Sequence, residues 1–395
     1  MAQQVLVYRL TGSASALGIV SFCQVIPLVP FALWGGTLAD RVPKRTLILI
    51  TQTMMMVQAF LLSFLTWSGI IQIWHIYLMA VLLGMAKAVD MPARQSFVVE
   101  MVEGKEDLTS AIGLNSAIHN GARALGPALA GVAVAALGET VAFLLNGLSF
   151  LAVIAGLLMM RGLVAPRRKQ EDQVSVLKEV KEGARFVMGH QTILVLMSLV
   201  AVSSFLARPY SILMPVLADV LLKDSSRAAV SFLCMGDRAF FRCQTPEAIP
   251  LGLLLSAAGV GAVIGAFLVA SLPADSRRGR WLTLGNLTLP ALLLVFVLSR
   301  SFLLSLLLLV FIGLGQVFQN SLANTLLQIT TPDHLRGRVM SQYSLISGGM
   351  HHLGGLQAGF MADWLGAPFS VGLGAAISLA YGLFVAVRYP RVRNL

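Results

Sequence analysis

The sequence predicts an all-α membrane protein with eleven helical spans. Of its 395 residues, 57% are hydrophobic and 12% are charged, whereas roughly 25% of the residues in a soluble domain are charged. The charged residues are bunched, and the uncharged runs between them reach the roughly 20 residues that one helix needs to cross a bilayer. These runs are rich in Leu, Ala, Gly and Met and lack the alternation of barrel strands. The composition therefore excludes a soluble globular domain.

Glycine, proline and charged residues mark the boundaries of the spans. The predicted spans are 15–38, 46–67, 73–98, 108–137, 139–160, 191–215, 250–272, 281–299, 302–329, 336–361 and 366–387. Between the fifth and sixth spans, the charged stretch 171–190 has the pattern of an amphipathic helix. The chain is therefore expected to divide into an N-terminal helical bundle (1–161), a cytoplasmic linker (162–190) and a C-terminal helical bundle (191–395).

Basic residues orient the predicted spans. With the linker in the cytoplasm, twenty Lys and Arg residues lie on the cytoplasmic side and six on the outer side. Cytoplasmic loops carry such an excess, which accounts for the net charge of +11 without nucleic acid as a partner. The C-terminus is then cytoplasmic. An odd number of spans places the start outside, so we expect that a first helix is largely missing and that Met1–Leu10 is its outer end. An engineered or genuinely shortened start is the alternative.

An internal duplication supports a missing helix. A shift of 228 residues aligns 126–138 with 354–366 and pairs Gly126 with Gly354, Ala130 with Ala358, Gly131 with Gly359, Leu137 with Leu365 and Gly138 with Gly366. We therefore expect two pseudo-symmetric six-helix bundles, a 6+6 design in which the first helix is largely absent. Repeats of this kind build secondary transporters, whose site lies where the two halves meet.

The loop after the first full span contains a recognisable motif, GTLADRVPKR, at 36–45. It resembles the G-x-x-x-D-R-x-x-x-R/K signature of the major facilitator superfamily. The resemblance implies that this loop is a conformational latch on the cytoplasmic side that does not bind substrate. The latch residues would be Gly36, Asp40, Arg41, Lys44 and Arg45. The alternative is that the basic residues serve only to orient the chain.

A glycine-rich stretch between 113 and 131 is similar to the antiporter motif of proton-coupled exporters in this superfamily. The matching residues are Gly113, Gly121, Gly126, Pro127 and Gly131. Ala130 departs from the motif because it occupies the first position of the final glycine pair. The match favours export. The alternative is a tightly packed helix with no bearing on the direction of transport.

Four further segments resemble one branch of the superfamily, the exporters related to enterobactin and macrolide efflux proteins. They are LTGSASALG at 10–18, PARQ at 92–95, LNSAIHNGARALGP at 114–127 and LRGRVMS at 335–341. The resemblance implies a monomeric secondary transporter of the bacterial inner membrane, with no enzymatic activity and no cofactor. We expect proton-coupled efflux of a small amphipathic molecule such as a siderophore, macrolide or drug. An importer, or a non-transporting remnant or regulatory membrane protein, is the alternative.

Charged residues inside spans are costly and are candidates for function. Lys87, Asp90 and Arg94 share one helix face at spacings of three and four residues. We hypothesise that Asp90 exchanges a proton, with Arg123 or Lys87 pairing with its ionised form. A permanent ion pair is the alternative.

A polar stripe on the predicted span 302–329 is a candidate lining of the substrate cavity. It comprises Gln316, Gln319, Asn320 and Asn324, and the span 191–215 adds Ser204 and Tyr210. In the superfamily these helices line the central cavity. Helix–helix hydrogen bonding is the alternative for amide side chains in a membrane.

The polar insert 223–247 lies on the outer side, where the family has a short loop. Cys234 and Cys243 in this insert either pair, as an oxidising compartment allows, or remain free thiols. His351 and His352 are adjacent and point to different faces, so the sequence predicts no metal site. It contains no phosphate-binding loop either.

Overall fold

The computed structural model describes residues 1–395 except 28–42, 101–104, 161–175, 235–242, 274–276 and 394. All regular elements in the described ranges are helical, which confirms the all-α class. The first half contains α1 (Ala2–Thr11), α2 (Ala14–Val25), α4 (Lys44–Trp67), α5 (Ile73–Glu100), α6 (Lys105–Met159) and α7 (Val176–Gly189). The second half contains α8 (Gln191–Val202), η1 (Ser203–Ala207), η2 (Arg208–Ser211), α9 (Met214–Leu222), α10 (Arg227–Cys234), α11 (Ala248–Ala270), α12 (Arg278–Leu298), α13 (Phe302–Thr330), α14 (Asp333–Leu365), α15 (Ala367–Arg388) and α16 (Pro390–Arg393).

Within the described residues, eight segments are long and apolar enough to cross a membrane. The count of eleven spans is not confirmed. The predicted span 15–38 extends into 28–42, outside the described residues. The predicted spans 108–137 and 139–160 fall within α6, which supplies a single candidate segment. The span 336–361 lies in α14, which is long enough but more polar than the eight.

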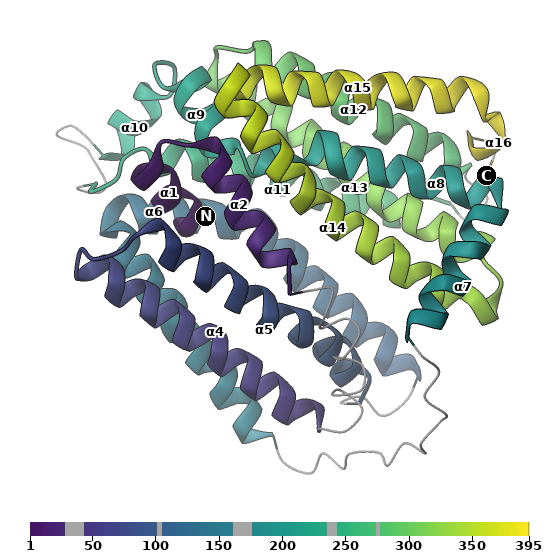
Figure 1. Cartoon of the computed structure of the whole chain (residues 1–395), viewed down its shortest axis with the longest axis horizontal. Helices are drawn as coiled ribbons and strands as arrows, with labels where there is room; N and C mark the ends of the chain where they lie inside the picture. The colour runs from purple at the N-terminus through teal and green to yellow at the C-terminus, as the bar shows by residue number, and fades with distance from the viewer. Residues whose placement is uncertain (28–42, 101–104, 161–175, 235–242, 274–276, 394) are drawn as a thin grey trace.

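The helices form two groups that follow the chain (Figure 1). In the first group, α4 packs against α5 and α6, and α2 packs against α5. In the second group, α13 packs between α11 and α12, while α15 packs against α12 and α14. Within each group, packing therefore joins sequence neighbours and also helices that are two or three elements apart along the chain.

The two ends of the helices differ in chemistry. At one end, called here the disulfide end, Cys234 and Cys243 form a disulfide beside Val134. At the other, called here the basic end, Nη1 of Arg338 lies 2.6 Å from a carboxylate oxygen of Glu182 on α7. Figure 1 shows the disulfide end on the left, with α9 and α10, and the basic end on the right, with α7 and α16.

Two helix pairs make the most extensive contacts between the groups, α2 with α14 and α6 with α11, and α1 also contacts α9. Both depend on close backbone approach. A Cβ atom on Gly18 of α2 would lie 2.6 Å from the carbonyl oxygen of Gly355 on α14. One on Gly131 of α6 would lie 2.8 Å from the Cα of Gly252 on α11. Without a hydrophobic drive between helices in lipid, such contacts depend on small residues that let backbones touch.

Two glycines paired by the 228-residue shift have the same unusual backbone conformation. Gly138 has φ 79° and ψ 169°, and Gly366 has φ 88° and ψ 145°. Positive φ favours glycine because a side chain would clash with the backbone. Each glycine ends one long helical segment and starts the next, so the predicted duplication extends to backbone geometry at these two positions.

The largest apolar cluster joins both groups. Leu6, Leu17 and Ile76 from the first group pack in the same buried cluster as Leu254 and Phe296 from the second. The groups therefore share a continuous packed region, which holds α1 and α2 against the second half of the chain.

The close crossing of α6 and α11 predicts that alanine substitutions at two glycines of α6 differ in their effect on stability. Gly131→Ala is expected to push the α11 backbone away and destabilise the protein by about 1–3 kcal/mol, the usual cost of overpacking. Gly126→Ala is the control, since nothing lies within 4 Å of a Cβ there. The measurement is the thermal unfolding midpoint in detergent. Equal midpoints for the two variants would contradict the proposed crossing.

Candidate functional site

Polar side chains from both groups meet where α2, α5 and α14 approach the start of the second group. Ser21 Oγ lies 2.7 Å from Nδ1 of His352 and so links α2 to α14. His352 also lies within electrostatic range of Lys87 on α5 and Arg208 on η2. His351 is adjacent, with its ring centroid 5.4 Å from that of His352. Lys87 and Arg208 are called the interface cations below, and His351 and His352 lie beside them.

Arg208 is positioned by a break in the helix that starts as α8. The chain passes through a π-helical turn, η1, and a 3-10 turn, η2, before α9 begins. Pro209 has no backbone N–H, so the regular hydrogen-bond ladder cannot continue through this point. Nη1 of Arg208 donates to Ser204 Oγ at 3.2 Å and to the carbonyl oxygen of Ser347 at 3.1 Å. The break thus aims a cation at α14.

The predicted polar stripe on α13 has two different environments. Gln319 is buried: its Oε1 accepts from Ser203 Oγ at 2.8 Å, and its Nε2 donates to Asn286 Oδ1 at 2.8 Å. These are helix–helix hydrogen bonds linking η1, α13 and α12. Gln316 and Asn324 are half-buried instead.

Other residues of the predicted lining pack close to this network. Ser204 and Tyr210 are buried, and Ser204 accepts from Arg208. Asn320 is half-buried, and its carbonyl oxygen accepts from Tyr343 Oη at 2.9 Å. Ser204 and Asn320 therefore have protein partners, Ser204 through its side chain and Asn320 through its backbone.

Asp90 is buried between α4 and α5. Its carboxylate accepts from Thr51 Oγ1 at 2.7 Å and from Gln52 Nε2 at 2.8 Å. Nε of Arg94, one turn along α5, lies 2.8 Å from Oδ2. The structure thus pairs Asp90 with Arg94, whereas Lys87 lies among the interface cations. The side chain of Arg123 is outside the described residues.

Part of the predicted latch also lies outside the described residues, namely Gly36, Asp40 and Arg41. Lys44 begins α4. Arg45 donates to the carbonyl oxygen of Leu158 at 3.0 Å and so joins α4 to the end of α6.

The antiporter-type stretch lies on α6 from Gly113 to Gly131. Nothing lies within 4 Å of a Cβ at Gly121 or Gly126, whereas Gly131 contacts α11. Pro127 is accommodated inside the helix, and its carbonyl oxygen faces Gly252. Of Gly121, Gly126 and Gly131, only Gly131 is required by close packing.

A carboxylate joins the groups at the disulfide end. Asp363 of α14 accepts from Ser13 Oγ at 2.7 Å and from the backbone N–H groups of Ala14 at 2.7 Å and Ser15 at 3.1 Å. It thereby caps the start of α2, where free N–H groups favour negative charge. Partial burial disfavours the charged form of Asp363, but hydrogen bonds from Ser15, Ser13 and Ala14 outweigh it and lower the pKa of this carboxyl.

The second helix pair is joined at the same end through backbone groups. The N–H groups of Gln244 and Thr245 donate to the carbonyl oxygen of Ala135 at 2.7 and 3.2 Å, and Thr245 Oγ1 donates to that of Val134 at 2.6 Å. These residues follow the Cys234–Cys243 disulfide directly, which settles the pairing that the sequence left open. The polar insert therefore anchors the start of α11 on α6.

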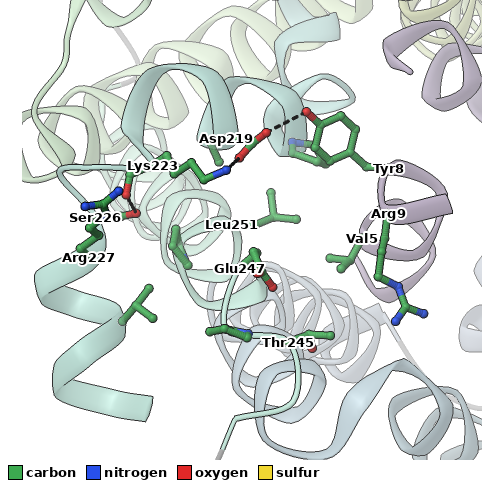
Figure 2. A pocket seen from close by; sticks show the side chains of 15 residues that line it. Val5, Tyr8, Arg9, Asp219, Lys223, Ser226, Arg227, Thr245, Glu247 and Leu251 are labelled. Carbon is green, nitrogen blue, oxygen red and sulfur yellow. Dashed lines mark hydrogen bonds and ion pairs between the residues drawn. The ribbon is translucent and has the colours of Figure 1, made fainter. Parts of the chain in front are cut away.

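A pocket of about 380 Å³ also opens at the disulfide end, between α1, α9, α10 and α11 (Figure 2). Tyr8 Oη donates to Asp219 Oδ2 at 3.1 Å, and Nζ of Lys223 lies 3.2 Å from Oδ1 of the same carboxylate. Arg227 and Glu247 lie on the wall of this pocket. It is thus separate from the interface cations.

Sequence reasoning missed several of these contacts. Arg208 is a charged residue within the predicted span 191–215, but its partners depend on the π-helical turn. His352 and Ser21 have no local pattern that pairs α2 with α14. Asp363 follows the apolar span as an ordinary terminal charge. The described residues contain no cluster of three or more His, Cys, Asp and Glu side chains suited to a metal.

A family model described as "Transmembrane secretion effector", MFS_3, matches residues 1–394. Among curated proteins, the staphyloferrin A transporter of Staphylococcus aureus is 28% identical over 54% of this chain, so the match spans about half, 53%, of that relative. The multidrug efflux pump Tap of Mycolicibacterium fortuitum is 26% identical over 99% of this chain and 91% of that protein.

Solved structures show the same fold at low sequence identity. The nucleoside transporter NupG has a TM-score of 0.74 and 10% identity, with 98% of this chain and 93% of that chain covered. An inward-facing, unoccupied bacterial homologue of the human lysosomal transporter Spinster has a TM-score of 0.66 and 15% identity, covering 99% of this chain and 92% of that one.

The hydrogen bonds of buried Gln319 predict that leucine substitutions within the polar stripe differ in their effect on stability. Gln319→Leu leaves Ser203 and Asn286 without this partner and is expected to destabilise the protein by about 1–2 kcal/mol. Gln316→Leu is the control, since Gln316 is half-buried and bonds to no described side chain. Thermal unfolding of purified protein in detergent measures both. A loss as large for Gln316→Leu would refute the distinction.

Proposed function

Since the chain belongs to the major facilitator superfamily, in its family of transmembrane secretion effectors, we propose that it exports a small amphipathic molecule in exchange for protons. Membership makes it a multi-pass membrane transporter of small molecules and not an enzyme. The observation that carries the proposal of export is the similarity to an efflux pump over 99% of the chain. The antiporter-type glycines on α6 support the same direction.

The proposed mechanism is alternating access by two six-helix bundles. Its basis is the arrangement of the two helix groups, joined by the pairs α2–α14 and α6–α11. The pseudo-symmetry rests on the matched backbone of Gly138 and Gly366. Rocking of the groups would open a path at one end while closing the other. Gln316, Asn320 and Asn324 are the proposed lining of that path.

The basic end is proposed to face the cytoplasm of a bacterial inner membrane. The excess of Lys and Arg supports this orientation. The disulfide supports it independently, because disulfides persist in oxidising compartments such as the periplasm. In this orientation Asp363 closes the outer end, and the motif that ends with Lys44 and Arg45 at the start of α4 acts as the latch on the cytoplasmic side.

Asp90 is the proposed proton carrier. It lies inside a span, and its carboxylate contacts Arg94 and two neutral donors, Thr51 and Gln52. Because Arg94 lies one turn from Asp90 on the same helix, rocking of the two groups leaves the pair together, and proton exchange requires the Arg94 side chain itself to move. Coupling then needs only one buried carboxylate whose partner changes between states.

The proton role predicts that Asp90→Asn uncouples transport. Purified protein in proteoliposomes is given an imposed pH gradient and radiolabelled erythromycin, and the variant is expected to lose gradient-driven flux while retaining exchange at equilibrium. Asp224→Asn is the matched control, since Asp224 is exposed and pairs with Arg227 at the surface. Full gradient-driven flux with Asp90→Asn would exclude this proton role.

Absence of flux for any molecule in a panel of macrolides, siderophores and lipophilic dyes, by protein that inserts correctly, would favour the non-transporting alternative. Counterflow in vesicles of known orientation distinguishes an importer from an exporter. These outcomes concern transport itself and are independent of the role of Asp90.

The Asp363 cap predicts a shift in the conformational equilibrium. Asp363→Ala removes three hydrogen bonds that close the outer end and is expected to raise the population open at that end about tenfold, as a cap of about 1.4 kcal/mol would. Spin labels on Leu10→Cys and Trp364→Cys, in a Cys23→Ser background, report the distance across this end.

Asp224→Ala, in the same labelled background, is the control because it removes an outer carboxylate that does not join the groups. A longer distance component is expected only with Asp363→Ala. An unchanged distance distribution would show that the cap does not hold the two groups together.

A further inference from the structure

The interface cations and the two histidines beside them come from three elements of both groups. Lys87 lies on α5, Arg208 on η2, and His351 and His352 on α14. The side chain of Lys87 is exposed, yet it acts electrostatically on His352 in the other group. Lys87 can therefore reach a molecule that lies between the two groups.

The predicted spans contain almost no negatively charged residues that could pair with these cations. No Asp or Glu occurs in 41–89, 108–138, 183–218, 248–274, 276–332 or 334–362. Asp90 is the one acidic residue inside the predicted spans, apart from those at their ends, and it is engaged by Arg94, Thr51 and Gln52. The ammonium of Lys87 forms no ion pair or hydrogen bond with any described residue.

A second observation concerns a buried ring nitrogen beside these cations. Nδ1 of His351 is buried without a hydrogen-bond partner among the described residues. Buried polar groups are almost always paired, and a cation inside a membrane protein is costly unless it is compensated. Lys87 and Arg208 both lie near the imidazole of His352, so these two positive charges also repel one another. A negatively charged ligand would relieve these costs together.

We propose that the interface cations bind an anionic group, a carboxylate, of the transported molecule. The inference rests on the proposed function, since it assigns the substrate class of that transport path. Lys87 supplies a charge-assisted hydrogen bond, which is roughly twice as strong as a neutral one. From the opposite group, Arg208 supplies further positive potential, and the two histidines supply imidazole N–H donors. Binding thus bridges the two groups through one anion.

The test measures binding with three fluorescent probes that share one aromatic body. Dansylglycine carries a carboxylate, dansylamide is neutral, and dansylcadaverine carries an ammonium. The purified full chain in detergent, at fixed ionic strength and pH 7, is titrated with each probe, and dansyl fluorescence reports occupancy. Dansylglycine is expected to bind at least about tenfold more tightly than dansylamide, with dansylcadaverine the weakest. Equal affinity for the three probes, or preference for the amine, overturns the proposal.

Variants locate the site. Lys87→Gln is expected to weaken dansylglycine binding about tenfold and to leave dansylamide unchanged, while Lys87→Arg retains affinity for the anion. Arg300→Gln is the matched control, since it removes an exposed cation between α12 and α13. Unchanged dansylglycine affinity with Lys87→Gln contradicts the proposal. If that variant does not fold, the comparison of the three probes on the unaltered protein still decides.

Failure of this inference is distinguishable from failure of the proposed function. Preference for dansylcadaverine together with gradient-driven flux overturns the anion site and leaves export standing. Binding of dansylglycine that depends on Lys87, without flux of any molecule, supports the anion site and overturns transport. A role of the cations in proton relay alone predicts no preference among the three probes.

Discussion

Close backbone approach between helices holds the two groups of this protein together. At the crossings of α2 with α14 and α6 with α11, glycine faces glycine and leaves no room for a methyl group. Because such contacts act only over a short range, they fix the positions of helices that are distant in sequence relative to one another. The contacts of Ser21 with His352 and of Asp363 with the start of α2 depend on this placement, because each joins atoms on helices that the crossing brings together.

The interface carries two kinds of polar group with different physical tasks. Gln319, Ser203 and Asn286 satisfy one another and act as internal fasteners of the second group. The ammonium of Lys87 and Nδ1 of His351, by contrast, form no hydrogen bond with any described residue. In a membrane, where the surrounding lipid offers no compensation, that contrast separates groups that stabilise the fold from groups available to a ligand.

Much of the helical layout could be predicted from the sequence, since charge-free runs of sufficient length specify helices in lipid almost by themselves. The paired glycines at 138 and 366 also identified equivalent turns. The unwinding of α8 was not predictable, because Pro209 alone does not specify a π-helical turn. The burial of Gln319, in place of an exposed stripe, depends on the rotation of α13 against α12, and an amide is polar in either orientation. The Asp363 cap needs a partner about 350 residues away.

The two crossings are fastened differently at the disulfide end. Between α6 and α11, backbone hydrogen bonds to Ala135 follow directly after a disulfide-closed insert. Between α2 and α14, the fastening is one carboxylate on three donors. Hydrogen bonds to one side chain break more readily than backbone hydrogen bonds that a neighbouring disulfide holds in place. We therefore expect the two groups to separate first between α2 and α14, while α6 and α11 stay in contact and act as the hinge.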